Sequence, residues 1–325
     1  MKKVFILMLV ALTTLAVVSA QPMYEKRLTD APLTVQFAVM AGPTGFSSAG
    51  LTDENGMIND TLKVETTVYP SPNEVIARLA NGELDFACLP TNVAANLYNK
   101  GVKAKIAAVV GNGTLSVLSS DGSVADVADL MGKTVHIPGA GSTPDQISQL
   151  LLLKAGLEVG KDVILDYSVA APAQVAQMLI AGKISLAVLP QPFVSMVLTK
   201  NPKVSVVADM QKLYADIVKI ENYPMTVLMV TDAFAQAHPL ALDTILDAYA
   251  SSVEWVNANV EEAGAVIEKI GIMNAALATP AIPFCNLVFV PAQKAKGEVQ
   301  SFYESLFAFS PASIGGKLPA EDLYL

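Results

Sequence analysis

An internal repeat limits what this chain of 325 residues can fold into more than any other feature of its sequence. Residues 71–98 align without gaps on residues 171–198. Each copy has helical apolar spacing that stops at a glycine, followed by an apolar run ending in Leu-Pro, a pattern typical of a helix and a buried strand. Ser71 and Glu74 also form a capping box before the first helix. The repeat predicts two similarly built α/β lobes rather than a solenoid, although chance agreement between two helix–strand units stays open. The identical pairs are Pro72/Pro172, Val75/Val175, Leu79/Leu179, Gly82/Gly182, Ala87/Ala187, Leu89/Leu189 and Pro90/Pro190.

Strand and helix patterns alternate along the rest of the chain, which favours parallel sheets. We therefore expect an α/β protein with two Rossmann-like lobes joined by a hinge of two crossings. Lobe 1 comprises residues 31–118 and 226–325, and lobe 2 comprises residues 119–225. A glycine loop is expected at 41–48 and a short helix at 124–130. Strands are expected at 33–40, 62–69, 84–89, 134–137, 162–167, 203–208 and 225–230, with one or two more between 102 and 119.

Residues 136–153 join a strand end, a glycine turn and the start of a helix. Gly139 and Gly141 allow the backbone to turn and approach a ligand closely. Thr143, with Pro144 at the first helical position and Gln146 three residues after the threonine, predicts a capping box. Free N–H groups and the positive end of the helix dipole would then face a bound molecule. A capped turn that binds nothing is the alternative interpretation.

Ligands of open α/β sheets bind beyond the carboxyl ends of the strands. The residues expected there carry hydroxyls, amides, backbone N–H groups and aromatic rings, and none is Lys, Arg, His or Cys. General acid–base and nucleophilic catalysis therefore lack candidates, and binding without chemistry is the simpler conclusion. A small polar, zwitterionic or heteroaromatic molecule fits such a site, and an anion held by N–H groups and hydroxyls stays open. The candidate site residues are Gly42, Pro43, Thr44, Gly45, Phe46, Thr91, Asn92, Gly141, Ser142, Thr143, Gln191, Phe193 and, near the second crossing, Tyr223.

The start of the chain has the pattern of a secretory signal peptide. Lys2 and Lys3 precede an uncharged apolar run, and Val18-Ser19-Ala20 fits cleavage after Ala20. No cysteine lies near this position, so a lipoprotein is not expected, and an uncleaved anchor is the alternative.

The formal net charge is −9, and no cluster of Lys and Arg occurs, so nucleic acid is excluded as a partner.

The two cysteines and two histidines offer no metal or cofactor site. Cys88 and Cys285 both lie in apolar runs, which favours two buried thiols over a disulfide. His136 and His238 are isolated from each other and from a cysteine pair, so neither a zinc site nor a Cys/His nucleophile is expected.

Several of these segments together resemble one family. The chain is similar to the substrate-binding proteins of ABC importers in the nitrate/sulfonate/taurine and thiamine-pyrimidine-precursor superfamily. The segments that carry the resemblance are Gly42-Pro43-Thr44-Gly45, Leu89-Pro90-Thr91-Asn92, Gly132-Lys133-Thr134 with the turn at 138–144, Leu189-Pro190-Gln191-Pro192-Phe193 and the tail at 313–319.

The resemblance implies the type II periplasmic binding protein fold. It further implies a periplasmic monomer that captures a small solute, closes its two lobes and delivers the solute to a membrane permease. One branch has Pro-Glu-Pro-Phe where this chain has Gln191, so a charged ligand contact is not carried over. The alternatives are an enzyme on the same fold, acting on a pyrimidine or menaquinone-route metabolite, and an exported ligand-sensing domain.

Overall fold

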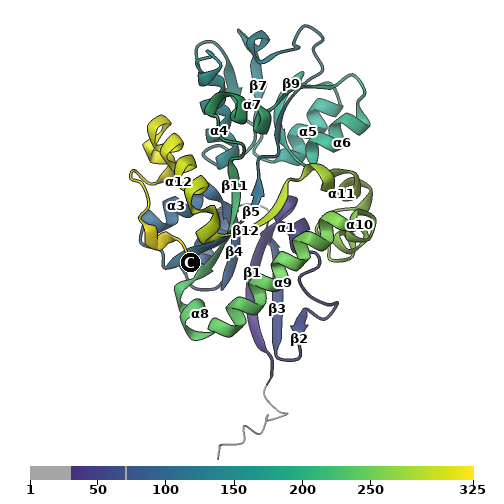
Figure 1. Ribbon diagram of the computed structural model, residues 1–325. Coiled ribbons are helices and arrows are strands. Elements are labelled where there is room, and N and C mark those ends of the chain that lie inside the picture. Colours follow the sequence, from purple (N-terminus) through teal and green to yellow (C-terminus); the bar gives the residue numbers. More distant parts are fainter. Residues whose placement is uncertain (1–30, 70–71) are drawn as a thin grey trace, which may run out of the picture. The chain divides into compact units, whose positions relative to one another are not determined.

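The computed structural model describes residues 31–69 and 72–325 (Figure 1). Within this part of the chain, Pro32–Leu325 forms one compact unit. The expected signal peptide and the cap residue Ser71 lie outside the described residues.

The first sheet has seven strands, of which β1 is parallel to β3 and β4. Strand β11 lies antiparallel between β4 and β5, so a late segment of the chain is placed in the middle of the sheet. In sheet order the strands are β12 (Leu287–Pro291), β5 (Ala104–Asn112), β11 (Pro224–Thr231), β4 (Phe86–Pro90), β1 (Leu33–Met40), β3 (Leu62–Tyr69) and β2 (Met57–Asn59).

The second sheet has five strands and repeats this neighbourhood. Strand β9 is parallel to β7 on one side and antiparallel to β6 on the other, as β4 is to β1 and β11. In sheet order the strands are β10 (Ser205–Asp209), β6 (Leu115–Ser119), β9 (Leu186–Pro190), β7 (Thr134–His136) and β8 (Ile164–Asp166). The repeated sequence segments therefore occupy equivalent positions in two sheets.

The helices of the repeat also correspond, since α2 (Pro72–Ala80) and α5 (Pro172–Ile180) end in the same way. Gly82 and Gly182 follow them with φ of 75° and 68°, a left-handed conformation that favours glycine. The other α-helices are α1 (Pro43–Ser47), α3 (Thr91–Asn99), α4 (Thr143–Lys154), α6 (Phe193–Lys200), α7 (Met210–Val218), α8 (Asp232–Ala237), α9 (Pro239–Ala258), α10 (Val260–Lys269), α11 (Ala275–Ala281) and α12 (Ala292–Phe309). Short 3₁₀ helices are η1 (Val127–Leu130), η2 (Ile282–Phe284), η3 (Pro311–Ile314) and η4 (Glu321–Leu323). None of the helices among the described residues combines the length and apolar character that a membrane crossing requires.

The first sheet is covered by helices on both faces. Neighbouring side chains of a strand point to opposite faces, so they pack in different core clusters. Phe37 of β1 packs in the same core cluster as α1, α9 and α10, whereas its neighbour Ala38 belongs to the cluster of α2, α3 and α12. Figure 1 shows α1, α9 and α10 together, apart from α3 and α12. The second sheet is built likewise, with α4 and α7 in one cluster and α5 and α6 in another. Both sheets therefore have two buried faces, which explains the continuous apolar runs of their strands.

The chain crosses between the sheets earlier than the sequence indicated. Strand β5 ends at Asn112, and β6 begins at Leu115 in the second sheet, where it pairs with β9. Residues 115–118, expected in lobe 1, therefore belong to the second sheet, because β5 already ends at Asn112, whereas the sequence placed the boundary after Leu118. The return crossing ends at Pro224, where β11 begins. The helix expected at 124–130 is only the 3₁₀ turn η1, which is held by a capping box of Asp126 and Asp129.

Candidate functional site

The loop expected after β1 is a short helix, α1. Gly42 precedes it with φ of 109°, and Pro43 occupies its first turn, where no N–H group is needed. The hydroxyl of Thr44 bonds to the backbone N–H and carbonyl of Met40, both at 3.0 Å, and fixes the turn. The side chain of Phe46 is fully buried in the core of the first sheet, so its ring packs rather than faces a cleft.

Gly42 lies against the end of a strand of the second sheet. A Cβ atom added to Gly42 would lie 3.5 Å from Cδ of Pro192 and 3.9 Å from the carbonyl oxygen of Gln191. A Cβ atom on Gly45 would come within 2.9 Å of Ile272, so this glycine is needed for packing against the segment between α10 and α11. Gly42 and Gln191 are therefore brought together.

The end of β4 contributes Thr91 and Asn92, which begin α3. Asn92 is 1% exposed, and its amide nitrogen donates to the carbonyls of Gly141 at 3.0 Å and Ser313 at 3.3 Å. Its Oδ1 accepts the hydroxyl proton of Thr143 at 2.7 Å, and its backbone N–H donates to the same hydroxyl oxygen at 3.2 Å. Asn92 thus joins the first sheet to the start of α4 and to the C-terminal tail. The hydroxyl of Thr91 is fully buried and has no hydrogen-bond partner among the described residues.

The capping box predicted for Thr143 and Gln146 is wrong. Ser142 occupies the N-cap position, and its hydroxyl donates to the carbonyl of Gly139. Thr143 instead turns its hydroxyl toward Asn92, because the two sheets meet at this point. The amide oxygen of Gln146 is buried without a partner among the described residues. The residue that holds the turn is Asp145, whose Oδ2 accepts the N–H of Gly141 at 2.7 Å.

The end of β9 places Gln191, Pro192 and Phe193 at the start of α6. The amide oxygen of Gln191 accepts the N–H of Ser195 at 3.2 Å and its hydroxyl at 2.9 Å, so it caps the helix. The backbone N–H of Gln191 donates to the carbonyl of Thr114 at the first crossing. Phe193 is half-buried against the core of the second sheet. The structure therefore uses the amide at position 191 as a local acceptor.

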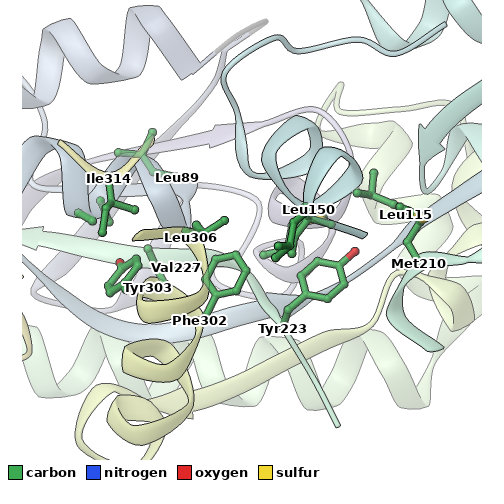
Figure 2. Close-up of a cluster of buried hydrophobic side chains, with 14 of the residues drawn as sticks. Leu89, Leu115, Leu150, Met210, Tyr223, Val227, Phe302, Tyr303, Leu306 and Ile314 are labelled. Carbon is green, nitrogen blue, oxygen red and sulfur yellow. The ribbon is translucent and has the colours of Figure 1, made fainter. Parts of the chain in front are cut away.

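Tyr223 lies in the core and not on the surface of a cleft. Its ring is fully buried and meets Tyr214 edge to face at 5.2 Å between centroids. Figure 2 shows its ring between Phe302 and Met210. Burial raises the pKa of its phenol, which stays protonated at neutral pH. Tyr223 thus fixes the second crossing by packing.

A pocket of about 380 Å³ lies at the first crossing and includes only Gln191 of the expected site residues. Its polar lining comes from both sides of the crossing and includes Thr114, Ser195, Asp209, Gln211 and Asn286. The exposed ring of Phe284 also lines it. The sequence interpretation missed these residues. Gly111-Asn112-Gly113, between two apolar runs, is nevertheless a signal that one strand ends and another begins.

Gln211 ties the two crossings together at this pocket. Its Oε1 accepts the N–H of Gly113 at 3.0 Å, and its Nε2 donates to the carbonyl of Glu221 at 2.6 Å and to Oδ1 of Asn222 at 3.1 Å. Asn286, with φ of 48°, donates to the carbonyl of Gly113 at 3.1 Å. One side chain of α7 therefore fixes the first segment that connects the sheets relative to the second.

The strand-end residues Thr91, Asn92, Thr143 and Gln191 carry hydroxyls and amides. Within residues 31–69 and 72–325, no three His, Cys, Asp or Glu side chains gather in a way that could hold a metal ion. Cys88 and Cys285 are both buried free thiols, as expected, and burial raises the pKa of Cys88 to about 12. A thiol with so high a pKa is a poor nucleophile at neutral pH.

The NMT1-like family matches residues 35–271 of the chain. An ABC transporter from Parabacteroides distasonis has a similar structure, with a TM-score of 0.77 and 28% identity over 90% of this chain and 98% of that chain. The periplasmic aliphatic sulphonate binding protein of Escherichia coli is 16% identical over 91% of this chain and 92% of its own, with a TM-score of 0.73. The periplasmic nitrate-binding protein of Synechocystis is 17% identical over 90% and 88% of the two chains, with a TM-score of 0.68. No curated protein sequence matches the chain significantly.

Proposed function

Because the chain belongs to the NMT1-like family, we propose that it is the extracytoplasmic solute-binding component of an ABC importer. The observation that carries this proposal is the meeting of strand ends from two equivalent sheets. Asn92 after β4 bonds to Gly141 and Thr143 after β7, and Gly42 after β1 lies against Pro192 after β9. This is the edge where open α/β sheets bind ligands. The similarity to an ABC transporter of known structure adds support.

The proposed solute is a small polar or heteroaromatic molecule held between the two sheets. Its proposed contacts are the hydroxyl of Thr91, the backbone around Gly42 and Gly141, and the amide of Gln191. Thr91 supports this position for the solute, because a buried hydroxyl without a partner costs free energy unless a ligand or water satisfies it. Thr44, Asn92, Thr143 and Phe193 shape the site, while Phe46 and Tyr223 support it from the core.

The proposed setting is the periplasm, reached with a signal peptide that is cleaved after Ala20. The protein then acts as a monomer, closes around its solute and delivers it to a permease in the membrane. The periplasmic location of structurally similar binding proteins supports export.

We propose no catalytic step for this site. The proposed solute contacts are hydroxyls, amides and backbone groups, whereas general acid–base chemistry needs a titratable side chain within reach of the solute. A binding protein of an importer has to release its solute unchanged, and these residue types are sufficient for that.

Mass spectrometry of the small molecules released on denaturation of freshly purified protein tests the proposal. We expect one solute to be enriched over a mock purification and to remain chemically unaltered after incubation with the native protein. Thr91→Val should weaken its binding about tenfold, because one hydrogen bond is lost. Thr66→Val, an exposed position on β3, is the matched control and should leave binding unchanged. Turnover of the solute, or the absence of any captured solute, would contradict the proposal.

A further inference from the structure

The first turn of α4 contains a buried carboxylate that the proposed function does not use. Asp145 is only 3% exposed. Its Oδ2 accepts the backbone N–H of Gly141 at 2.7 Å. Its Oδ1 accepts the hydroxyl of Tyr167 at 2.7 Å and the amide N–H of Gln149 at 2.9 Å. Three donors, from the glycine turn, from the segment after β8 and from α4 itself, therefore converge on one carboxyl group.

Proteins commonly bind anions with donors of this kind. A glycine turn, a free backbone N–H and the positive end of a helix dipole together attract a negative charge. In this chain the position is occupied by an internal carboxylate. The sequence alone suggested that the turn would offer its N–H groups to a ligand, but the N–H of Gly141 is already bonded to Asp145.

Among the described residues, the hydrogen-bond partners of Asp145 are all uncharged. The carbonyl of Gly141 and the hydroxyl of Thr143 are bonded to Asn92 of the first sheet, so Asp145 lies directly behind the contact between the sheets. The pocket at the first crossing is lined by Asp209 and by no Lys, Arg or His. A negative solute held against Gly141 would lie close to the buried carboxyl group of Asp145, where like charges repel more strongly than in bulk water.

We propose that Asp145 is a specificity-determining residue that selects against anionic solutes. The solute is then uncharged or cationic. This inference rests on the proposed function, because it concerns the charge of the solute captured between the sheets.

The first test uses the unmodified protein and simple anions. Sulfate, nitrate and methanesulfonate are titrated against it by calorimetry, with chloride at matched ionic strength as the reference. We expect no saturable binding of any of the three. Saturable binding of one of them would overturn the selection against anions, and the importer function would stand.

The second test asks whether the side chain of Asp145 fills an anion position. Asp145→Ala leaves the donors of Gly141, Tyr167 and Gln149 without an acceptor. Formate should therefore bind to this variant and raise the midpoint temperature of its unfolding. We expect the dissociation constant for formate to fall at least about tenfold relative to the unmodified protein. Asp145→Asn still fills the position and should show no gain. If formate has no effect on the alanine variant, the proposal is wrong.

The matched control is Asp129→Ala. Asp129 also accepts two backbone N–H groups, those of Ala125 and Asp126, but it is exposed on η1. Its donors can be satisfied by water, so formate should not stabilise this variant. A response equal to that of Asp145→Ala would show a general salt effect and overturn the proposal. Failure of the importer function has a different signature, since no solute of any charge would then be captured by the native protein.

Discussion

Gly113 shows at the scale of one residue how the two sheets are joined. A Cβ atom at this position would lie 2.3 Å from Cζ of Tyr223 and 2.3 Å from Oε1 of Gln211. Both neighbours belong to the second crossing or to the helix that holds it, so there is no space for a side chain where the segments that connect the sheets approach each other. Gly111, two residues earlier, would place its Cβ atom 3.8 Å from Thr226, an ordinary contact.

Gly113→Ala is therefore expected to destabilise the protein by about 1–3 kcal/mol, the usual cost of overpacking. Gly111→Ala is the matched control and should cost less than about 1 kcal/mol, because the added methyl group fits. Urea unfolding of both variants measures the difference. Equal stabilities of the two variants would contradict the close approach at Gly113.

The start of α4 shows at the scale of an element what a sequence pattern can and cannot predict. The glycine turn, Pro144 and the apolar spacing predicted a helix here, and α4 begins at Thr143. The partner of Thr143 was predicted within the helix, but the structure has it on α3, where Asn92 bonds to its hydroxyl. A capping residue and a residue that joins two sheets look alike in sequence, because both need a short hydroxyl side chain.

A double-mutant cycle distinguishes the two roles. Thr143→Val removes the hydroxyl and leaves buried groups of Asn92 unpaired, which should cost about 1–3 kcal/mol. Combined with Asn92→Ala, the cycle should give a coupling free energy of about 0.5–3 kcal/mol. Combined with Gln146→Ala, it should give a coupling near zero, because the capping box is not formed. Coupling to Gln146 and not to Asn92 would favour the capping interpretation.

The whole molecule is held together by a core that both sheets share. One cluster contains Leu89 and Val227 of the first sheet, Leu115 of the second, and Phe302 of α12, as Figure 2 shows. Leu150 of α4 belongs to the same cluster. Burial of apolar surface is the main favourable term in folding, so each sheet loses a large part of its buried core if the other unfolds.

We therefore expect residues 32–325 to unfold in one cooperative step. Trp255, the only tryptophan of the chain, packs against the core of the first sheet and reports on that sheet by fluorescence. Far-UV circular dichroism reports on the helices that pack against both sheets. The two thermal transitions should coincide. A circular dichroism transition without a change in fluorescence would show that the second sheet unfolds separately.

Much of the fold could be predicted from the sequence because the physics involved is local. Strand β1 was predicted with its observed bounds, and the repeat correctly placed α2 with α5 and β4 with β9. The site was harder to predict, because which groups meet depends on residues far apart in the chain. Gly42 meets Pro192, whereas Phe46 and Tyr223 turned out to be buried in the core. The ligand contacts themselves stay a prediction.

The sequence by itself determined the alternation of strands and helices, the duplicated unit and the uncharged character of the candidate site residues, since periodicity and residue type act within a few residues. Only the tertiary structure decided which donors are free. Hydrogen-bond capacity is used by whichever partner the fold brings within about 3 Å, and for Gly141 that partner is the carboxylate of Asp145. The turn that the sequence left available to a ligand therefore already has an acceptor, because Asp145 in the first turn of α4 bonds to its N–H group.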